Sequence, residues 1–101
     1  MRLKDKVAII SGAASGMGAS TARLFAKEGA KVVVADLMEA EGAKVVSDIN
    51  DAGGEARFQS LNVTSETDWE ATVSETITAY GQVDILVNNA AVRGRKPFVE
   101  L

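Results

Sequence analysis

Three glycines and one carboxylate are the residues whose types and spacing could do chemistry. Gly12, Gly16 and Gly18 follow a short apolar run, and Asp36 ends a second apolar run 24 residues after Gly12. Glycines let backbone N–H groups approach a pyrophosphate, and a helix that begins among them presents its positive end to the phosphates. A carboxylate at about this distance can accept hydrogen bonds from both hydroxyls of a ribose. The pattern therefore predicts a dinucleotide site.

The three glycines have separate roles in such a turn. Gly12 lets the chain leave a strand through backbone angles that a Cβ opposes, Gly16 leaves space for the phosphates, and Gly18 permits close helix–strand packing. Their spacing, G-x-x-x-G-x-G, differs from the general G-x-G-x-x-G fingerprint, and glycines alone also fit an ordinary loop between packed elements. The flanking apolar runs and Asp36 favour the nucleotide interpretation.

Apolar runs alternate with stretches of helical periodicity along the chain. Strands are predicted at 7–11, 31–36, 56–62 and 83–88. Strands that alternate with helices form parallel sheets with right-handed crossovers, so the predicted class is α/β with a doubly wound parallel sheet.

The predicted helix before the fourth strand has a clear start signal. Ser65 is followed three residues later by Asp68, as in a capping box. The side chains expected to face the core are Trp69, Val73, Ile77 and Tyr80. The fourth strand lacks polar alternation at 85–87, which predicts a strand covered on both faces, yet nothing after it predicts a neighbouring strand or a covering helix.

Composition excludes several classes of function. The 101 residues allow one domain, and an apolar fraction of 47% fits a globular α/β protein. The formal net charge is −3 without basic or acidic blocks, so neither a nucleic acid nor a membrane partner is expected. Without cysteine or histidine we expect no disulfide, thiolate chemistry or metal site. No secretory signal or membrane-spanning run is visible, and we expect a cytoplasmic protein.

Four motifs follow one another along the chain: SGAASGMG at 11–18, Asp36, Asn62-Val63, and DILVNNAA at 84–91. Together they resemble the short-chain dehydrogenase/reductase family, classical subgroup, over the whole chain. The resemblance implies a Rossmann-like sheet whose four strands have the order 3-2-1-4, with the cofactor lying across their carboxyl ends.

The resemblance also assigns cofactor-binding roles to individual positions. These are Ser15, Gly16 and Met17 at the phosphate-facing turn, Asp36 and Leu37 at the adenosine ribose, Asn62 and Val63 beside adenine, and Asn89, Ala90 and Ala91 along the cofactor. Gly12 and Gly18, which shape the glycine turn, complete the predicted cofactor-binding set. The family usually has aspartate at position 62, where an amide oxygen can still accept from the adenine amino group, and glycine at position 91. Asn88 is expected to support the sheet instead.

Other interpretations of these residues stay open. Asn62 could cap a turn, and Asn88-Asn89 could form a turn that serves only the backbone. The basic run at 93–96 could attract an acidic substrate or lie in a solvated loop.

The cofactor is predicted to be NAD. Asp36 would repel the 2′-phosphate of NADP, and neither Ser15 nor Leu37 offers a basic side chain to hold that phosphate. With it we expect an oxidoreductase that passes a hydride between NAD(H) and a small-molecule secondary alcohol or ketone. The substrate stays open among a hydroxysteroid, a simple secondary alcohol, a sugar and a 3-oxoacyl thioester. A homo-oligomer, dimer or tetramer, is expected.

The family's catalytic residues do not appear in this sequence. The resemblance implies that these are a serine, an assisting asparagine, and a tyrosine followed four residues later by a lysine. Tyr80, the only tyrosine of this sequence, is instead followed by Gly81-Gln82-Val83-Asp84. We therefore expect residues 1–101 to be the N-terminal part of one Rossmann domain, truncated before the catalytic segment. The alternative is a non-catalytic NAD-binding or interaction module that is complete at 101 residues.

Overall fold

Strands and helices alternate along the chain as their periodicities predict. The computed structural model describes residues 3–14, 16–89 and 98–100. Its elements are β1 (Val7–Ser11), α1 (Gly16–Lys27), β2 (Lys31–Asp36), α2 (Glu39–Asp51), β3 (Glu55–Ser60), α3 (Glu66–Tyr80), β4 (Ile85–Asn88) and β5 (Phe98–Glu100). None of the helices in these ranges has the length and hydropathy needed to span a bilayer.

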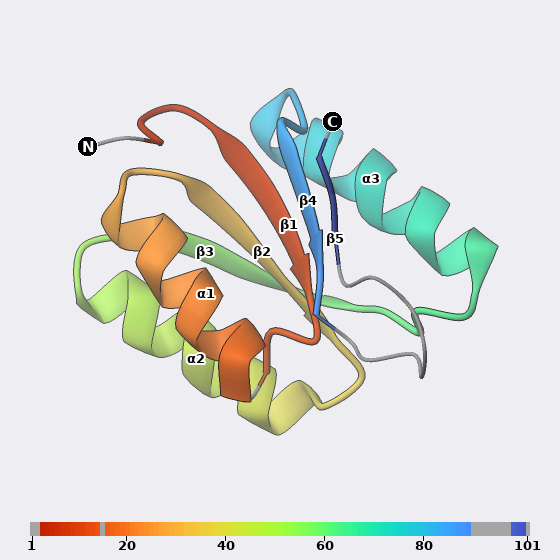
Figure 1. The fold of residues 1–101 in the computed structure, drawn as a ribbon, viewed down its shortest axis with the longest axis horizontal. Helices are drawn as coiled ribbons and strands as arrows, with labels where there is room; N and C mark the ends of the chain where they lie inside the picture. Colours follow the sequence, from red (N-terminus) through yellow and green to blue (C-terminus); the bar gives the residue numbers. More distant parts are fainter. Residues whose placement is uncertain (1–2, 15, 90–97, 101) are drawn as a thin grey trace.

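The sheet has the strand order β3-β2-β1-β4-β5 (Figure 1). The first four strands are parallel, which confirms the predicted order 3-2-1-4. The register pairs Ser11 with Ala35 on β2 and with Asn88 on β4. The carboxyl ends of these strands therefore meet at one edge of the sheet, where the glycine turn also begins.

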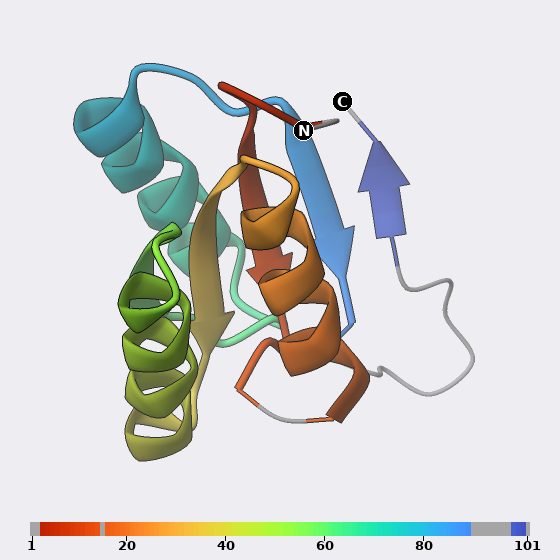
Figure 2. The same cartoon turned by 90° about the vertical axis from the view of Figure 1, so that its left-hand side faces the viewer.

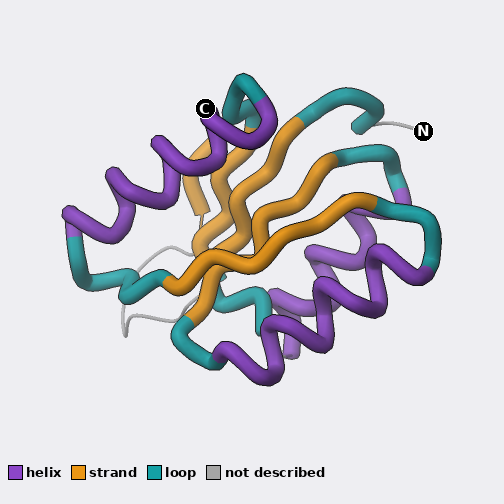
Figure 3. Tube along the Cα trace, turned by 180° about the vertical axis from the view of Figure 1, so that it is seen from behind, coloured by secondary structure: helices purple, strands orange, loops and turns teal. Residues whose placement is uncertain are grey.

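Helices cover both faces of the sheet. Helices α1 and α2 lie on one face and α3 lies on the other, as the views from the side and from behind show (Figures 2 and 3). Alternate residues of β1 enter the two cores: Ala8 and Ile10 pack on the α1–α2 side, and Ile9 packs on the α3 side. All three are fully buried, so β1 is the centre of the fold, as its unbroken apolar run predicts.

The fourth strand is shorter than predicted and has a neighbour that was not predicted. Strand β4 begins at Ile85, and its outer edge pairs antiparallel with β5, with Leu86 opposite Val99. The expectation that nothing follows to pair with it was therefore wrong. A strand of three residues carries too little periodicity to be recognised from sequence.

The buried face of α3 also differs from the prediction. Thr72 and Thr76 are buried, whereas Ile77, expected in the core, is 48% exposed. The two threonine hydroxyls donate to backbone carbonyls one turn earlier, at 2.8 and 2.7 Å, so their burial leaves no unsatisfied donor. Trp69, Val73 and Tyr80 pack partly buried against the sheet as predicted.

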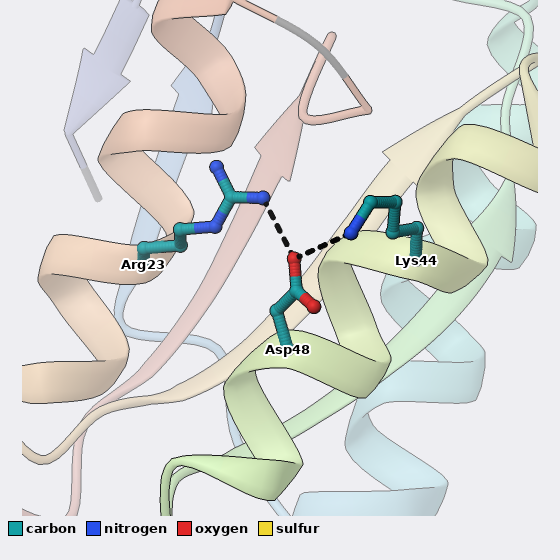
Figure 4. Close-up of polar contacts among 3 residues, drawn as sticks. All are labelled: Arg23, Lys44 and Asp48. Atoms are coloured by element: carbon teal, nitrogen blue, oxygen red, sulfur yellow. Dashed lines mark hydrogen bonds and ion pairs between the residues drawn. The ribbon is translucent and has the colours of Figure 1, made fainter.

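A small ion-pair cluster joins α1 to α2. Arg23 on α1 and Lys44 on α2 both reach the Asp48 carboxylate, at 3.0 and 3.5 Å (Figure 4). The hydrogen bond from Arg23 is the main reason that the pKa of Asp48 lies below its usual value. Because all three side chains are exposed to solvent, we expect the cluster to add little to stability.

Candidate functional site

A cavity of about 340 Å³ lies at the carboxyl ends of the parallel strands. Residues at or just after the ends of all four parallel strands, together with the first turn of α1, line it: Gly12, Met17, Gly18, Asp36, Leu37, Leu61, Asn62, Val63 and Asn89. The structure thus brings together eight of the predicted site residues. Gly16 begins α1 beside this cavity, and Ser15, Ala90 and Ala91 lie outside the described residues. Leu61 was not predicted as part of the site.

The glycine turn passes closely over the start of α1. Gly12 leaves β1 with φ of 65° and Gly16 has φ of 58°. Residues other than glycine rarely adopt positive φ values of this kind. A Cβ added at Gly18 would lie only 2.0 Å from the carbonyl oxygen of Gly12. Gly12 and Gly18 therefore let the backbone of the turn contact the backbone of the helix directly, as predicted.

Asp36 is held by two backbone N–H groups. Its Oδ2 accepts from the N–H of Ala14 at 3.1 Å, and its Oδ1 accepts from the N–H of Met38 at 3.0 Å. The carboxylate thereby ties the glycine turn to the end of β2. Each carboxylate oxygen has a second lone pair, so both can still accept a hydrogen bond from a ligand hydroxyl.

The segment after β3 is held by the start of α3. The N–H of Asn62 donates to Asp68 Oδ2 at 2.9 Å, and the indole N–H of Trp69 donates to the carbonyl of Val63, also at 2.9 Å. Ser65 caps the helix as predicted, because its hydroxyl accepts from the N–H of Asp68 at 3.1 Å. The carboxylate of Asp68, however, accepts from Asn62, so the reciprocal half of the capping box is absent and the acid anchors a cavity residue instead.

The side chain of Asn62 already has hydrogen-bond partners. Its Oδ1 accepts from the backbone N–H of Thr64 at 3.0 Å and from the Thr64 hydroxyl at 2.7 Å. The turn-capping interpretation of Asn62 is thus confirmed, while the side chain still lines the cavity. Its oxygen is engaged by both Thr64 donors.

The end of β4 contributes two asparagines with different surroundings. The hydroxyl of Ser11 donates to Asn88 Oδ1 at 2.7 Å, which confirms that Asn88 supports the sheet. The backbone N–H of Asn89 donates to the carbonyl of Ser11 at 3.2 Å. Among the described residues, the buried Nδ2 of Asn89 has no hydrogen-bond partner. An unsatisfied buried donor is unfavourable, so a ligand that offers an acceptor here would be stabilised.

The described lining holds one carboxylate and two amides but no tyrosine, lysine or serine. Tyr80 is the last residue of α3, and its ring centre is 5.7 Å from the ammonium group of Lys31. Lys31 is the first residue of β2, so Tyr80 lies at the amino ends of the strands, away from the cavity at their carboxyl ends. Burial, followed by the charge of Glu55, raises the pKa of Tyr80. The described part of the cavity can therefore hold a ligand but offers no acid–base pair for proton transfer.

Comparison with known proteins identifies the family. The sequence profile described as short chain dehydrogenase matches residues 6–101, and the chain belongs to that family. A 3-alpha-(or 20-beta)-hydroxysteroid dehydrogenase of Mycobacterium tuberculosis is 46% identical over 91 residues, which are 90% of this chain and 34% of that protein. The mitochondrial borneol dehydrogenase of Lavandula x intermedia is 43% identical over 93 residues, covering 92% of this chain and 34% of that protein.

A solved structure supports the same assignment. The crystal structure of a hydroxysteroid dehydrogenase from Escherichia coli superposes with a TM-score of 0.87 and 44% sequence identity, covering 96% of this chain and 41% of that one. The chain thus spans about a third of the curated relatives described above.

Proposed function

We propose that this chain is the cofactor-binding part of an NAD-dependent dehydrogenase that acts on a secondary alcohol or its ketone. The observation that carries the proposal is the Asp36 carboxylate, which two backbone N–H groups hold at the rim of the strand-end cavity. The family assignment supports the nicotinamide cofactor class. The choice of NAD and the roles of single residues are our inference.

The residues present fit a dinucleotide. Gly18 in the first turn of α1 leaves no room for a Cβ, because the backbone of the glycine turn lies against it. This turn therefore lies close to the start of the helix, where phosphates would bind. Asp36 keeps free lone pairs for the two ribose hydroxyls, and Leu37, 60% exposed, offers an apolar surface next to it. The unpartnered Nδ2 of Asn89 offers a hydrogen-bond donor further along the cavity.

Asp36 is the basis for preferring NAD over NADP. A 2′-phosphate would replace the hydroxyl that donates to this carboxylate and would place a second negative charge beside it. Neither Ser15 nor Leu37, the two positions where a basic side chain would be expected to hold that phosphate, is basic. One hydrogen bond to a charged group contributes about 1.5–3 kcal/mol, which corresponds to a preference of roughly 10- to 100-fold.

Bound NAD supplies the hydride acceptor for alcohol oxidation, and its reduced form supplies the hydride for ketone reduction. The residues of this chain bind and orient the cofactor. We assign the proton-transferring groups to the part of the relatives' length that this chain does not span. The named substrates of the relatives, a hydroxysteroid and borneol, are secondary alcohols carried on alicyclic skeletons, and we propose the same class here. A homo-oligomer and a cytoplasmic location stay predictions.

Isothermal titration calorimetry, which measures the dissociation constants of the chain for NAD and for NADP, tests the proposal. We expect NAD to bind at least tenfold more tightly, and Asp36→Ala to reduce that ratio, because it removes both the hydrogen bonds to the ribose of NAD and the repulsion of the 2′-phosphate of NADP. Asp51→Ala removes the same charge at the last residue of α2, where the side chain is exposed, and should leave the ratio unchanged. Tighter binding of NADP by the unaltered chain would reject the assignment.

A further inference from the structure

The amide of Asn62 has a fixed orientation. Its oxygen faces Thr64, which donates both its backbone N–H, at 3.0 Å, and its hydroxyl, at 2.7 Å. A backbone N–H can only donate, so the amide nitrogen cannot take the position of the oxygen without placing two donors against each other. The oxygen therefore stays on the Thr64 side, and the NH₂ group stays on the other side.

The main chain around Asn62 resists rotation of this residue as a whole. Its N–H is held by the Asp68 carboxylate at 2.9 Å, and its carbonyl accepts from the N–H of Ser65 at 2.9 Å. Within the described part of the chain, the Asn62 NH₂ group has no hydrogen-bond partner. The residue is exposed and lines the same cavity as Asp36 and Leu37.

The geometry points to Asn62 as a hydrogen-bond donor toward the base of the dinucleotide, so that the site tolerates a 6-oxopurine in place of adenine. This inference rests on the proposed function, in which Asp36 binds the ribose that carries the base. Adenine presents an amino donor at C6, which needs an acceptor. Hypoxanthine presents an oxo acceptor at C6, which an amide NH₂ satisfies. Because Thr64 engages the amide oxygen, Asn62 favours the second arrangement.

The isosteric variant Asn62→Asp reverses this polarity. One carboxylate oxygen can keep both Thr64 bonds, while the other places an acceptor where the NH₂ group was. The experiment measures dissociation constants of the chain for NAD and for nicotinamide hypoxanthine dinucleotide. Gln59→Glu is the matched control, because it adds the same charge on the neighbouring strand β3 at a residue that does not line the cavity.

We expect Asn62→Asp to raise the ratio of the hypoxanthine to the adenine dissociation constant by about tenfold, the effect of one hydrogen bond gained for adenine and lost for hypoxanthine. Gln59→Glu should leave that ratio unchanged. An unchanged or lower ratio in Asn62→Asp, with NAD still bound by the unaltered chain, would overturn the inference alone. Failure of the unaltered chain to bind either dinucleotide would overturn the proposed function and this inference with it.

A second measurement does not depend on the variant. In the unaltered chain, the side-chain NH₂ resonances of Asn62 should shift more on addition of the hypoxanthine dinucleotide than on addition of NAD. Equal shifts, or a larger shift with NAD, would contradict the donor assignment.

Discussion

Replacing Gly18 by alanine should damage the cavity through backbone contacts that cannot be relieved. The new Cβ would lie 2.0 Å from the carbonyl oxygen and 2.7 Å from the carbonyl carbon of Gly12, and 3.0 Å from the Cα of Ala13. All three atoms belong to the main chain, so no side-chain rotation makes room. Overpacking of this kind typically destabilises by about 1–3 kcal/mol, and movement of the turn would also weaken NAD binding.

The change at Gly42 is a matched control. Both glycines lie in helices, so alanine gains about 1 kcal/mol of helix propensity at each position. At Gly42 the three atoms nearest to the added Cβ all belong to the ring of Phe58, with Cε1 at 2.3 Å, and a side chain can move further than a backbone can. We therefore expect Gly18→Ala to be the less stable of the two variants.

Urea denaturation followed by circular dichroism gives the free energy of unfolding, and titration gives the affinity for NAD. We expect Gly18→Ala to lose up to about 2 kcal/mol net of the propensity gain, which lowers the melting temperature of a domain of this size by up to about 15 °C. Its NAD affinity should fall, while Gly42→Ala keeps the affinity of the unaltered chain. A Gly18→Ala variant with unaltered stability and affinity would refute the close-packing argument.

Two further predictions concern the contacts that hold β1 and the segment after β3. The pKa of Asp84 lies below its usual value, chiefly because its carboxylate accepts from the N–H of Val7 at 2.9 Å and next because Gln82 donates to it. The contribution of Asp84 to stability is therefore present above about pH 4 and is lost as the pH falls through the lowered pKa. Asp84→Asn should then reduce the fall of the melting temperature at acid pH. An unchanged dependence of the melting temperature on pH would contradict this role. Trp69→Phe removes the indole donor to the Val63 carbonyl and should lower the free energy of unfolding by about 1 kcal/mol and weaken NAD binding, and a variant that matches the unaltered chain in both would show that the bond does not position Val63.

The parts of the site that sequence predicts are those fixed by the local backbone. A strand, a glycine turn and a helix follow directly from residues 7–27, and Gly12 and Gly18 have the conformation and the close contact expected of them. Asp36 ends β2, and the parallel register with β1 brings it to the same edge as that turn. All of these features lie within residues 7–36, so no contact with a later part of the chain is needed to predict this arrangement.

The parts that sequence misses depend on hydrogen bonds between side chains and backbone. Hydropathy ranks Ile77 above Thr72, yet Thr72 is buried, and the bond from its hydroxyl to the carbonyl of Asp68 removes the cost of burying that donor. The donor polarity of Asn62 likewise depends on Thr64, whose hydroxyl and N–H both turn toward the amide oxygen. The Asn-x-Thr spacing is the available signal, since asparagine often accepts from the N–H two residues later. Leu61 follows β3 directly, and only the folded structure places it in the cavity lining.

The central claim is that NAD binds at the carboxyl ends of the parallel strands, and mapping backbone amide resonances during NAD titration tests it most directly. We expect the largest shifts at Gly12, Gly18, Leu37 and Val63, which line the cavity, and small shifts at Gly81, the C-cap residue after α3, which lies away from that edge. Asp36→Ala should reduce the shifts at the same residues at a given concentration of NAD. Saturable shifts centred on the opposite edge of the sheet, or none at millimolar NAD, would contradict the account.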